Sequence, residues 1–555
     1  MQARFSPNAA AWFYRILLVV FLLIFVFVWI RNAWLSDDAY ITLRTVYNFL
    51  HSLGPNFNPG ERVQTYTHPL WFLVLIPTHA LTGEGYYSTL ALSFFVSLAT
   101  LFLLIKFLAR TPQQALFAIG AMILSGAYID YSSSGLENPL SQLMLALFFI
   151  PFFATTSMRR LFWASLAAAL TTLTRFDLIL IVLPPLVLVF IQTWQAYPQQ
   201  RRRVLATLAV GFVPLLLWCL FALVYYGMLL PNTYYAKMPA NVSLAMWLGQ
   251  GWNYFLHSLR VDPITLAVIA FAVGVAIYAR DRALICIAGG IILYLIYVWR
   301  IGGDFMSGRF FTAPFFCALI ILVRVELLSK FEYLASIALG ALLLGFLAPR
   351  PPILSDETFG ALTDPERIAL VGPDRVTDQR AFYYHWTGLL RNLDGMKNFE
   401  QLTEVQEGLR VRAGRGGIFR TTGMGIRSYY AGPAIYVVDE LALADPFLAW
   451  LPRKDGWWLI GHFTRCPPLG YAVTIQGKTI VRKRRNFIKN EIQEPALAEL
   501  YEQLWLLERG NPFDSRRLAA ILKLNLGGYN SLRSQTYPCE NFWGGSADPA
   551  SQIAK

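Results

Sequence analysis

Six short polar segments separate long apolar stretches in the first 349 residues of this 555-residue chain. They are SDDAY (36–40), NPGERVQTYTHPLW (58–71), SSSGLENP (132–139), TRFD (174–177), LLPNTYYAK (229–237) and GGDFMSGRF (302–310). Ionisable groups at membrane depth are costly, and by default they mark a functional site. We therefore expect these segments, although distant in sequence, to meet at one site.

The segments combine carboxylates with cations. The carboxylates are Asp37, Asp38, Glu137, Asp177 and Asp304, and the other polar members are Arg175, Lys237, Arg309, Asn232, Tyr234, Tyr235 and His68. Cations beside a membrane are suited to hold a lipid-linked phosphate, and carboxylates can act as a base, a nucleophile or a stabiliser of an oxocarbenium ion. This is the chemistry of sugar transfer from a polyprenyl phosphate carrier. The phosphate ester supplies the energy, so no nucleotide motif is needed.

Each polar segment also has a purely structural interpretation. Ser36 or Asp37 could cap a helix, and PNTYY could be a turn with tyrosines at the membrane interface. Lys237 could simply place its ammonium at that interface, with its alkyl chain in the apolar region and no role in binding. His68 could be a packed loop residue.

The charged pairs leave two further alternatives open. Arg175 with Asp177, and Asp304 with Arg309, could be structural ion pairs. Asp37, Asp38 and Asp304 could instead supply oxygen ligands to a divalent metal. We expect no metal and no other cofactor, and the histidines lack the spacing of a zinc site.

The composition indicates an integral membrane protein. Hydrophobic residues make up 56% of the chain and charged residues only 15%, whereas soluble proteins carry about 25% charged residues. Residues 1–349 hold 21 Lys or Arg and 12 Asp or Glu, and residues 350–555 hold 26 and 22. This contrast predicts a transmembrane domain over 1–349 and a water-exposed domain over 350–555. We expect no nucleic-acid partner, because the net charge of +13 forms no dense basic stripe outside 482–485.

Eleven apolar segments are candidates for membrane spans of about 20 residues. They cover roughly 14–34, 88–107, 115–132, 138–155, 161–174, 177–194, 204–226, 263–279, 283–299, 311–327 and 332–348. Segment 69–82 is short and contains Pro77 and His79, so we expect it to lie at the interface or to re-enter.

The distribution of charge sets the expected orientation. With the N-terminus in the cytoplasm and segment 69–82 not crossing, the cytoplasmic side receives thirteen basic and three acidic residues. The opposite side receives eight basic and nine acidic residues. Cytoplasmic loops carry an excess of Lys and Arg, so this orientation is favoured. It places all six polar segments and the domain 350–555 outside the cytoplasm.

The exterior domain is predicted to be mixed α/β. AIYVVDEL and YAVTIQGKTIVRKR read as strands, and PALAELYEQLWLLERG has helical periodicity. Exposed aromatics, Trp457, Trp458 and Tyr430, are candidates for binding an acceptor glycan, although the tryptophans could instead be core residues. Cys466 and Cys539 could form a disulfide outside the cytoplasm or remain free thiols.

The ordered motifs resemble the GT-C superfamily of polytopic glycosyltransferases, and within it the AftB-like arabinofuranosyltransferases. The motifs are SDDAYITLRTVYNFLHSLGPNFNPGERVQTYTHPLW, SSGLENP, TRFD, PNTYYAK, GGDFMSGRF, DQRAFYYHWTGLLR, GIRSYYAGPAIYVVDELALADPFLA and WWLIGHFTRCPPLGY. The resemblance implies a GT-C fold in the bacterial cytoplasmic membrane, a polyprenyl-phosphoryl arabinofuranose donor and a periplasmic glycan acceptor. It also implies that Asp37 and Asp38 are the catalytic acidic pair. Lys237 and Arg309 match cations of the family's later motifs.

Other functions remain as alternatives. A GT-C transferase could use another polyprenyl-phosphate sugar to modify lipopolysaccharide or a surface protein. A transporter is disfavoured because the halves show no inverted repeat and the spans carry no mid-span charges. A non-catalytic assembly factor on the same fold is the remaining alternative.

Overall fold

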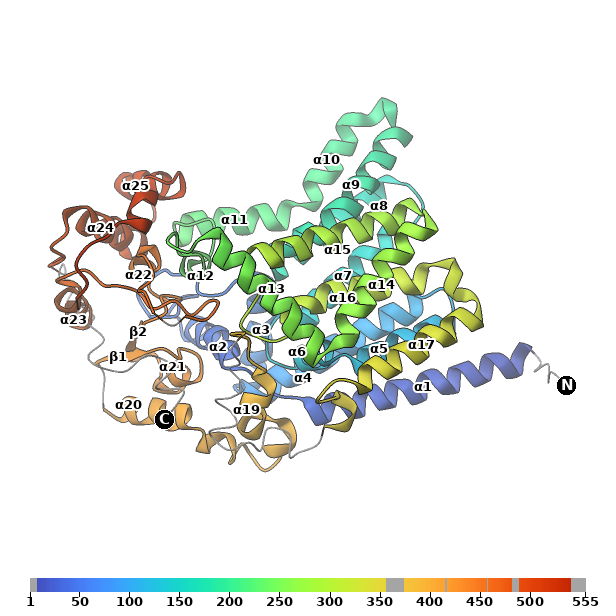
Figure 1. Ribbon diagram of the computed structural model, residues 1–555. Coiled ribbons are helices and arrows are strands. Elements are labelled where there is room, and N and C mark those ends of the chain that lie inside the picture. The colour runs from blue at the N-terminus through green and yellow to red at the C-terminus, as the bar shows by residue number, and fades with distance from the viewer. Residues whose placement is uncertain (1–6, 356–373, 415–416, 457, 482–488, 541–555) are drawn as a thin grey trace.

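The computed structural model describes residues 7–355, 374–414, 417–456, 458–481 and 489–540, and it is mostly helical (Figure 1). Trp457 and the basic run 482–485 lie outside the described residues. The first part of the chain contains α1 (Pro7–Asn32), α2 (Asp37–Leu50), α3 (Pro69–Thr82), α4 (Tyr86–Leu103), α5 (Pro112–Leu124), α6 (Gly126–Tyr131), α7 (Asn138–Phe152), α8 (Met158–Thr174), α9 (Ile179–Ala196), α10 (Arg201–Gly211), α11 (Val213–Tyr225), α12 (Asn232–Lys237), α13 (Leu244–Val261), α14 (Pro263–Ala279), α15 (Arg282–Arg300), α16 (Thr312–Arg324) and α17 (Phe331–Phe346).

The described residues after α17 fold into shorter helices and one small sheet. Its elements are α19 (Gln379–Thr387), α20 (Thr403–Ala413), β1 (Gly417–Thr421), α21 (Ile426–Ala431), β2 (Ile435–Asp439), α22 (Pro446–Trp450), α23 (Tyr471–Val481), α24 (Pro495–Arg509) and α25 (Ser515–Asn525). Strands β1 and β2 pair in parallel, from Gly417 opposite Ile435 to Thr421 opposite Asp439, and α21 connects them. Figure 1 shows these elements gathered at the end of the helical body that lies away from the N-terminus.

The apolar helices confirm that the chain is a polytopic helical membrane protein. Within the described ranges, four helices are long and apolar enough to cross a bilayer, namely Trp12–Asn32, Tyr86–Leu108, Phe176–Ala196 and Arg282–Arg300. Two bent pairs could each add a span, with bends of 53° between α10 and α11 and 108° between α13 and α14. Length and composition therefore identify four to six spans, and the other predicted segments fall on shorter helices. Segment 69–82 forms one of these, α3, which has 14 residues.

Two predictions for elements of residues 350–555 are confirmed and one is wrong. AIYVVDEL contains β2, and PALAELYEQLWLLERG contains α24. The run beginning at Tyr471, predicted as a strand, is instead α23. The buried residues Tyr471, Thr474 and Ile475 follow a helical spacing of three and four, whereas Val473 between them is exposed. The β-branched residues Val473, Thr474 and Ile475 suggest a strand, but packing of one helical face decides the structure.

A buried arginine joins α2 to the C-terminal elements. Arg44 is 2% exposed, and its guanidinium donates to the backbone oxygens of Phe57, Ser428, Gly432 and Ile435. Such a buried cation is tolerated because carbonyl dipoles surround it and satisfy its donors. The main hydrophobic core continues across this contact, since it includes residues of both parts of the chain.

Replacing Arg44 with methionine is expected to lower the free energy of unfolding by about 3 kcal/mol, because several buried carbonyl groups lose their donor. Thermal unfolding of the protein in detergent, followed by tryptophan fluorescence, measures the loss. Arg410→Met, at an exposed position of α20, is the control and should leave the transition unchanged. Equal melting temperatures for both variants would contradict this role of Arg44.

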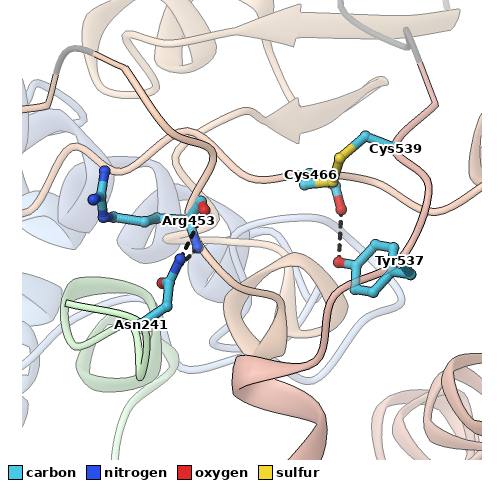
Figure 2. The surroundings of a disulfide bond; sticks show 5 residues. All are labelled: Asn241, Arg453, Cys466, Tyr537 and Cys539. Carbon is cyan, nitrogen blue, oxygen red and sulfur yellow. Dashed lines mark hydrogen bonds between the residues drawn. A yellow bond between two sulfur atoms is a disulfide. The ribbon is translucent and has the colours of Figure 1, made fainter.

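A disulfide fixes the C-terminal segment to the region after α22. Cys466 and Cys539 are bonded, with their Cα atoms 5.2 Å apart, so of the two alternatives the structure shows the disulfide (Figure 2). The Tyr537 hydroxyl donates to the Cys466 carbonyl at 2.7 Å and adds a second link between the same two segments.

Candidate functional site

Most of the predicted site residues lie at the ends of helices. Ser36 caps α2, so Asp37 and Asp38 are its first two residues. His68 and Glu137 immediately precede α3 and α7, and both of these helices carry proline in the first turn. Arg175 directly follows α8, Lys237 is the last residue of α12, and Arg309 begins the short helix η4 (Arg309–Phe311). Helix ends that meet on one side of the bundle can therefore bring these polar groups together.

Glu137 is the centre of a buried ion-pair network. Its side chain is fully buried and accepts from Arg175 Nη1 at 3.0 Å and from Arg309 Nη2 at 3.1 Å, and His68 Nδ1 lies 3.1 Å from its other oxygen. Burial alone would raise the pKa of the Glu137 carboxyl, but Arg309, His68 and Arg175 outweigh it and hold that pKa well below its usual range. Glu137 is thus a fixed anion that connects its own polar segment to three of the other five.

Two further carboxylates complete the pairing of the arginines. Asp177 holds Arg175 through two hydrogen bonds of 3.0 and 2.6 Å, and the Arg175 guanidinium also lies over the Phe310 ring. Asp304 Oδ2 lies 3.6 Å from Arg309 Nη1. The structural ion pairs left open by the sequence are therefore present. Arg309 still has one spare donor, because its buried Nε has no acceptor within the part of the chain that is described.

The two adjacent aspartates have different surroundings. Asp37 accepts from the backbone N–H of Gly425 at 3.2 Å and of Ile426 at 2.7 Å, so it caps α21. Gly425 is required there, because a Cβ at this position would lie 2.0 Å from the Asp37 carbonyl oxygen. Burial raises the pKa of Asp37 to about 7. Asp38 is partly buried, and among the described residues its carboxylate has no hydrogen-bond or ion-pair partner.

Asp38 and Lys237 belong to one electrostatic neighbourhood. The charges of both act on the imidazole of His462, and the charge of Asp38 also acts on Arg309. Lys237 is partly buried, and no described carboxylate pairs with its ammonium. Its alkyl chain packs beside Gly461, the neighbour of His462. The structure thus places Asp38, Lys237, Asp304 and Arg309 in one neighbourhood around His462 and Glu137.

Two other candidates for donor binding have contrasting positions. Asn232 is buried and donates its amide to the backbone oxygens of Ala442 and Leu443, each at 2.9 Å, so it holds α12 against the C-terminal elements. Tyr234 is 46% exposed, so it is more accessible than Asn232. The neighbouring Tyr235 stacks on the buried Trp450.

Two of the three aromatics predicted to bind the acceptor, Trp458 and Tyr430, are buried or partly buried. Trp458 is only 7% exposed and stacks on Phe463, so of the two placements considered it has the core one. Tyr430 is partly buried and makes ring contacts with Tyr40 and Phe399. Trp457 is outside the described residues.

His462 is a site residue that the sequence did not reveal. It is a lone histidine about 150 residues after the last polar segment of the membrane domain, and it has no partner residue at a recognisable spacing. The only available signal was its position within the family-like motif WWLIGHFTRCPPLGY. Within the described ranges, no three His, Cys, Asp or Glu side chains form a group that could hold a metal.

Sequence comparison finds two curated relatives with the same name. The terminal beta-(1->2)-arabinofuranosyltransferase of Mycobacterium tuberculosis is 30% identical over 404 residues, which are 64% of this chain and 63% of that protein. The chain is a homologue of these transferases. The protein of that name from Corynebacterium glutamicum is 30% identical over 341 residues, 53% of this chain and 48% of its own length. This confirms the family resemblance seen in the motifs, although the chain spans less than two thirds of either relative.

Other comparisons add less. No family model matches the chain. Two solved structures are similar over most of the chain, both of ArnT from Cupriavidus metallidurans. The structure bound to undecaprenyl phosphate has 13% sequence identity and a TM-score of 0.44, and covers 77% of this chain and 87% of that one. The apo structure has 14% identity and a TM-score of 0.45, with 79% and 88% covered.

Proposed function

We propose that this protein is a GT-C membrane glycosyltransferase that moves D-arabinofuranose from a polyprenyl-phosphate donor to a glycan acceptor. The observation that carries the proposal is the meeting of Asp38 and Lys237, whose charged groups pair with no described residue, beside the Glu137 ion-pair network. The names of the two relatives support arabinofuranose as the sugar.

The donor phosphate is placed between two cations in this proposal. Lys237 supplies an ammonium that no described carboxylate neutralises, and Arg309 supplies the buried Nε donor that has no acceptor. Arg175 already pairs with Glu137 and Asp177, so it acts on the phosphate only by fixing the network. Charge-assisted hydrogen bonds from such cations strengthen as the leaving phosphate gains negative charge.

Asp38 acts at the anomeric carbon or on the acceptor hydroxyl. During transfer, the bond from the anomeric carbon to the phosphate oxygen breaks and its electron pair leaves with polyprenyl phosphate. The acceptor oxygen forms a bond to the same carbon and loses its proton to a base. A carboxylate beside the sugar can attack the carbon first, with retention, or take that proton directly, with inversion.

The position of the site fits a donor whose lipid tail stays in the bilayer. The site residues lie at the helix ends next to the C-terminal elements, and the N-terminus of α1 lies at the far end of the molecule (Figure 1). We place this end outside the bacterial cytoplasmic membrane, where the polyprenyl tail can enter between helices and the glycan can approach from the periplasm. The excess of basic residues at the other side supports this orientation.

Transfer assays with the purified protein in lipid nanodiscs test the function. The expected result is incorporation of arabinofuranose from a radiolabelled polyprenyl-phosphoryl arabinofuranose into an arabinofuranose oligosaccharide. Preference for another polyprenyl-phosphoryl sugar would instead support the alternative GT-C transferase. No turnover with any sugar by a correctly folded protein would contradict the enzyme assignment and favour an assembly role.

Replacing Lys237 with methionine is expected to raise the KM for the donor by about 10-fold or more, because a charge-assisted hydrogen bond contributes about 1.5 to 3 kcal/mol. Lys237→Arg keeps the charge and should recover part of the affinity. Lys397→Met, at a side chain that is 73% exposed, is the control. Donor titrations of the initial rate measure the effect, and an unchanged KM in Lys237→Met would exclude Lys237 from donor binding.

A further inference from the structure

A loop of the C-terminal part reaches from the disulfide to the site. Its two ends pair as an antiparallel bridge between Arg453 and Arg465, and Lys454 N–H donates to the Thr464 carbonyl at 2.8 Å. Asn241 exchanges two hydrogen bonds of 3.0 Å with the Arg453 backbone, and the disulfide follows directly after Arg465 (Figure 2). The base of the loop is therefore fixed from both sides.

The tip of this loop is packed against three segments that carry site residues. Leu459 and His462 form a tight turn, with the His462 N–H donating to the Leu459 carbonyl at 2.8 Å. Leu459 shares a small buried cluster with three residues that neighbour site carboxylates in sequence: Ala39 follows Asp38, Leu136 precedes Glu137, and Phe305 follows Asp304. The turn thus sits where these segments converge.

The hydrogen bonds of His462 leave one ring nitrogen available for chemistry. Its Nδ1 lies 3.1 Å from the Ile460 carbonyl, and a carbonyl can only accept, so Nδ1 carries the hydrogen. In the neutral ring Nε2 is then an acceptor, and no described residue donates to it. The ring edge contacts Phe305 at 4.3 Å between centroids, which fixes the orientation of the imidazole.

The electrostatic surroundings suit a base rather than a permanent cation. Burial lowers the pKa of His462, while Asp38 and Asp304 raise it and Lys237 lowers it further. The charged groups that face the imidazole therefore come from α2, from α12 and from the segment before η4. A neutral imidazole next to Asp38 can accept a proton and is then stabilised by the two carboxylates.

We propose that His462 is the base that removes the proton from the acceptor hydroxyl. This inference rests on the proposed transfer reaction and assigns Asp38 to the anomeric carbon. As the acceptor oxygen bonds to that carbon, the bond from the carbon to the leaving oxygen breaks, and the electron pair stays on that oxygen. The leaving oxygen belongs to the Asp38 carboxylate if Asp38 has first displaced polyprenyl phosphate, and to the phosphate if the acceptor attacks directly. The hydroxyl proton moves to Nε2 and passes to water when the product leaves. The C-terminal part thus supplies the acceptor side of the site.

The test compares two substitutions at His462 in the full-length protein. His462→Asn places an amide N–H where Nδ1 was, so it can keep the bond to the Ile460 carbonyl while it removes the base. His462→Gln removes the base and moves the amide toward the Nε2 position. We expect both to lower kcat by about 100-fold or more, with little change in the KM for the donor. His51→Asn, at a surface histidine, is the control and should behave as wild type.

Three readouts separate a chemical role from a structural one. Wild-type kcat should fall as pH drops and His462 becomes protonated, and His462→Asn should lack this acid limb. Imidazole should restore part of the activity of His462→Gly. Melting temperatures and disulfide content of the Asn and Gln variants should match wild type. Near-normal kcat, or an unchanged acid limb, in a folded His462→Asn would overturn the inference. Inactive wild-type protein would instead count against the proposed function itself.

Discussion

Replacing Asp38 with asparagine is expected to lower the rate of sugar transfer by about 1,000-fold while the protein still folds. The Asp38 carboxylate pairs with no group in the described part of the chain, and asparagine has the same shape but can neither attack the anomeric carbon nor accept a proton. Because Asp38 has no described partner, removing its charge leaves no described buried cation without a counter-charge, and the fold should be unaffected. Single-turnover assays at saturating donor measure the effect on the chemical step.

The neighbouring residue gives a matched comparison. Asp37→Asn makes the same chemical change one position earlier, where the side chain accepts from Gly425 and Ile426. An asparagine oxygen can keep one of these bonds, and burial already raises the pKa of Asp37 to about 7, so a neutral side chain is tolerated there. We expect Asp37→Asn to stay within about 10-fold of the wild-type rate, as loss of a helix cap is a modest change. A reversed order of the two variants would contradict the assignment of Asp38.

Removing the carboxylate of Glu137 is expected to have the largest effect on stability. Glu137→Ala leaves Arg175 and Arg309 buried with one anion fewer, and breaking a buried ion pair from one side costs about 3 to 5 kcal/mol. Thermal unfolding in detergent measures this loss. Glu332→Ala, at an exposed position in the first turn of α17, is the control. Equal melting temperatures would show that the network does not stabilise the fold.

The pH dependence of this effect has a definite sign. The folded state holds the pKa of Glu137 well below its ordinary value, so its stabilisation is present at every pH above the unfolded value of about 4.5. The contribution is lost as the pH falls from there toward the folded pKa. The difference in melting temperature between wild type and Glu137→Gln should therefore be constant from about pH 8 to 5 and shrink at lower pH.

The sequence is most informative where the membrane restricts the chain. Polar groups are expensive near a bilayer, so the segments around Asp38, Glu137 and Arg309 were conspicuous against apolar surroundings. Their placement at helix ends then followed from the apolar lengths between them. The composition of residues 350–555 restricts the fold less, and the run at Tyr471, predicted as a strand, is a helix.

The different roles of Asp37, Asp38 and His462 depend on contacts between residues far apart in the sequence. Nothing in the pair Asp37–Asp38 indicates that one caps α21 while the other stays unpaired, because the N–H groups of Gly425 and Ile426 lie almost 390 residues away. His462 was missed for the same reason, since a long-range loop brings it to the site. For Trp458 the sequence leaves both an exposed glycan-binding position and a core position open, because a single tryptophan does not indicate which way its side chain faces.

The most direct test of the whole account is an experimental structure with a non-hydrolysable polyprenyl-phosphoryl arabinofuranose analogue. The account predicts that the phosphate lies within hydrogen-bond distance of Lys237 Nζ and Arg309 Nε, with the anomeric carbon facing Asp38 and an open path to His462. A donor bound elsewhere, with Asp38 and Lys237 both free of ligand, would contradict it.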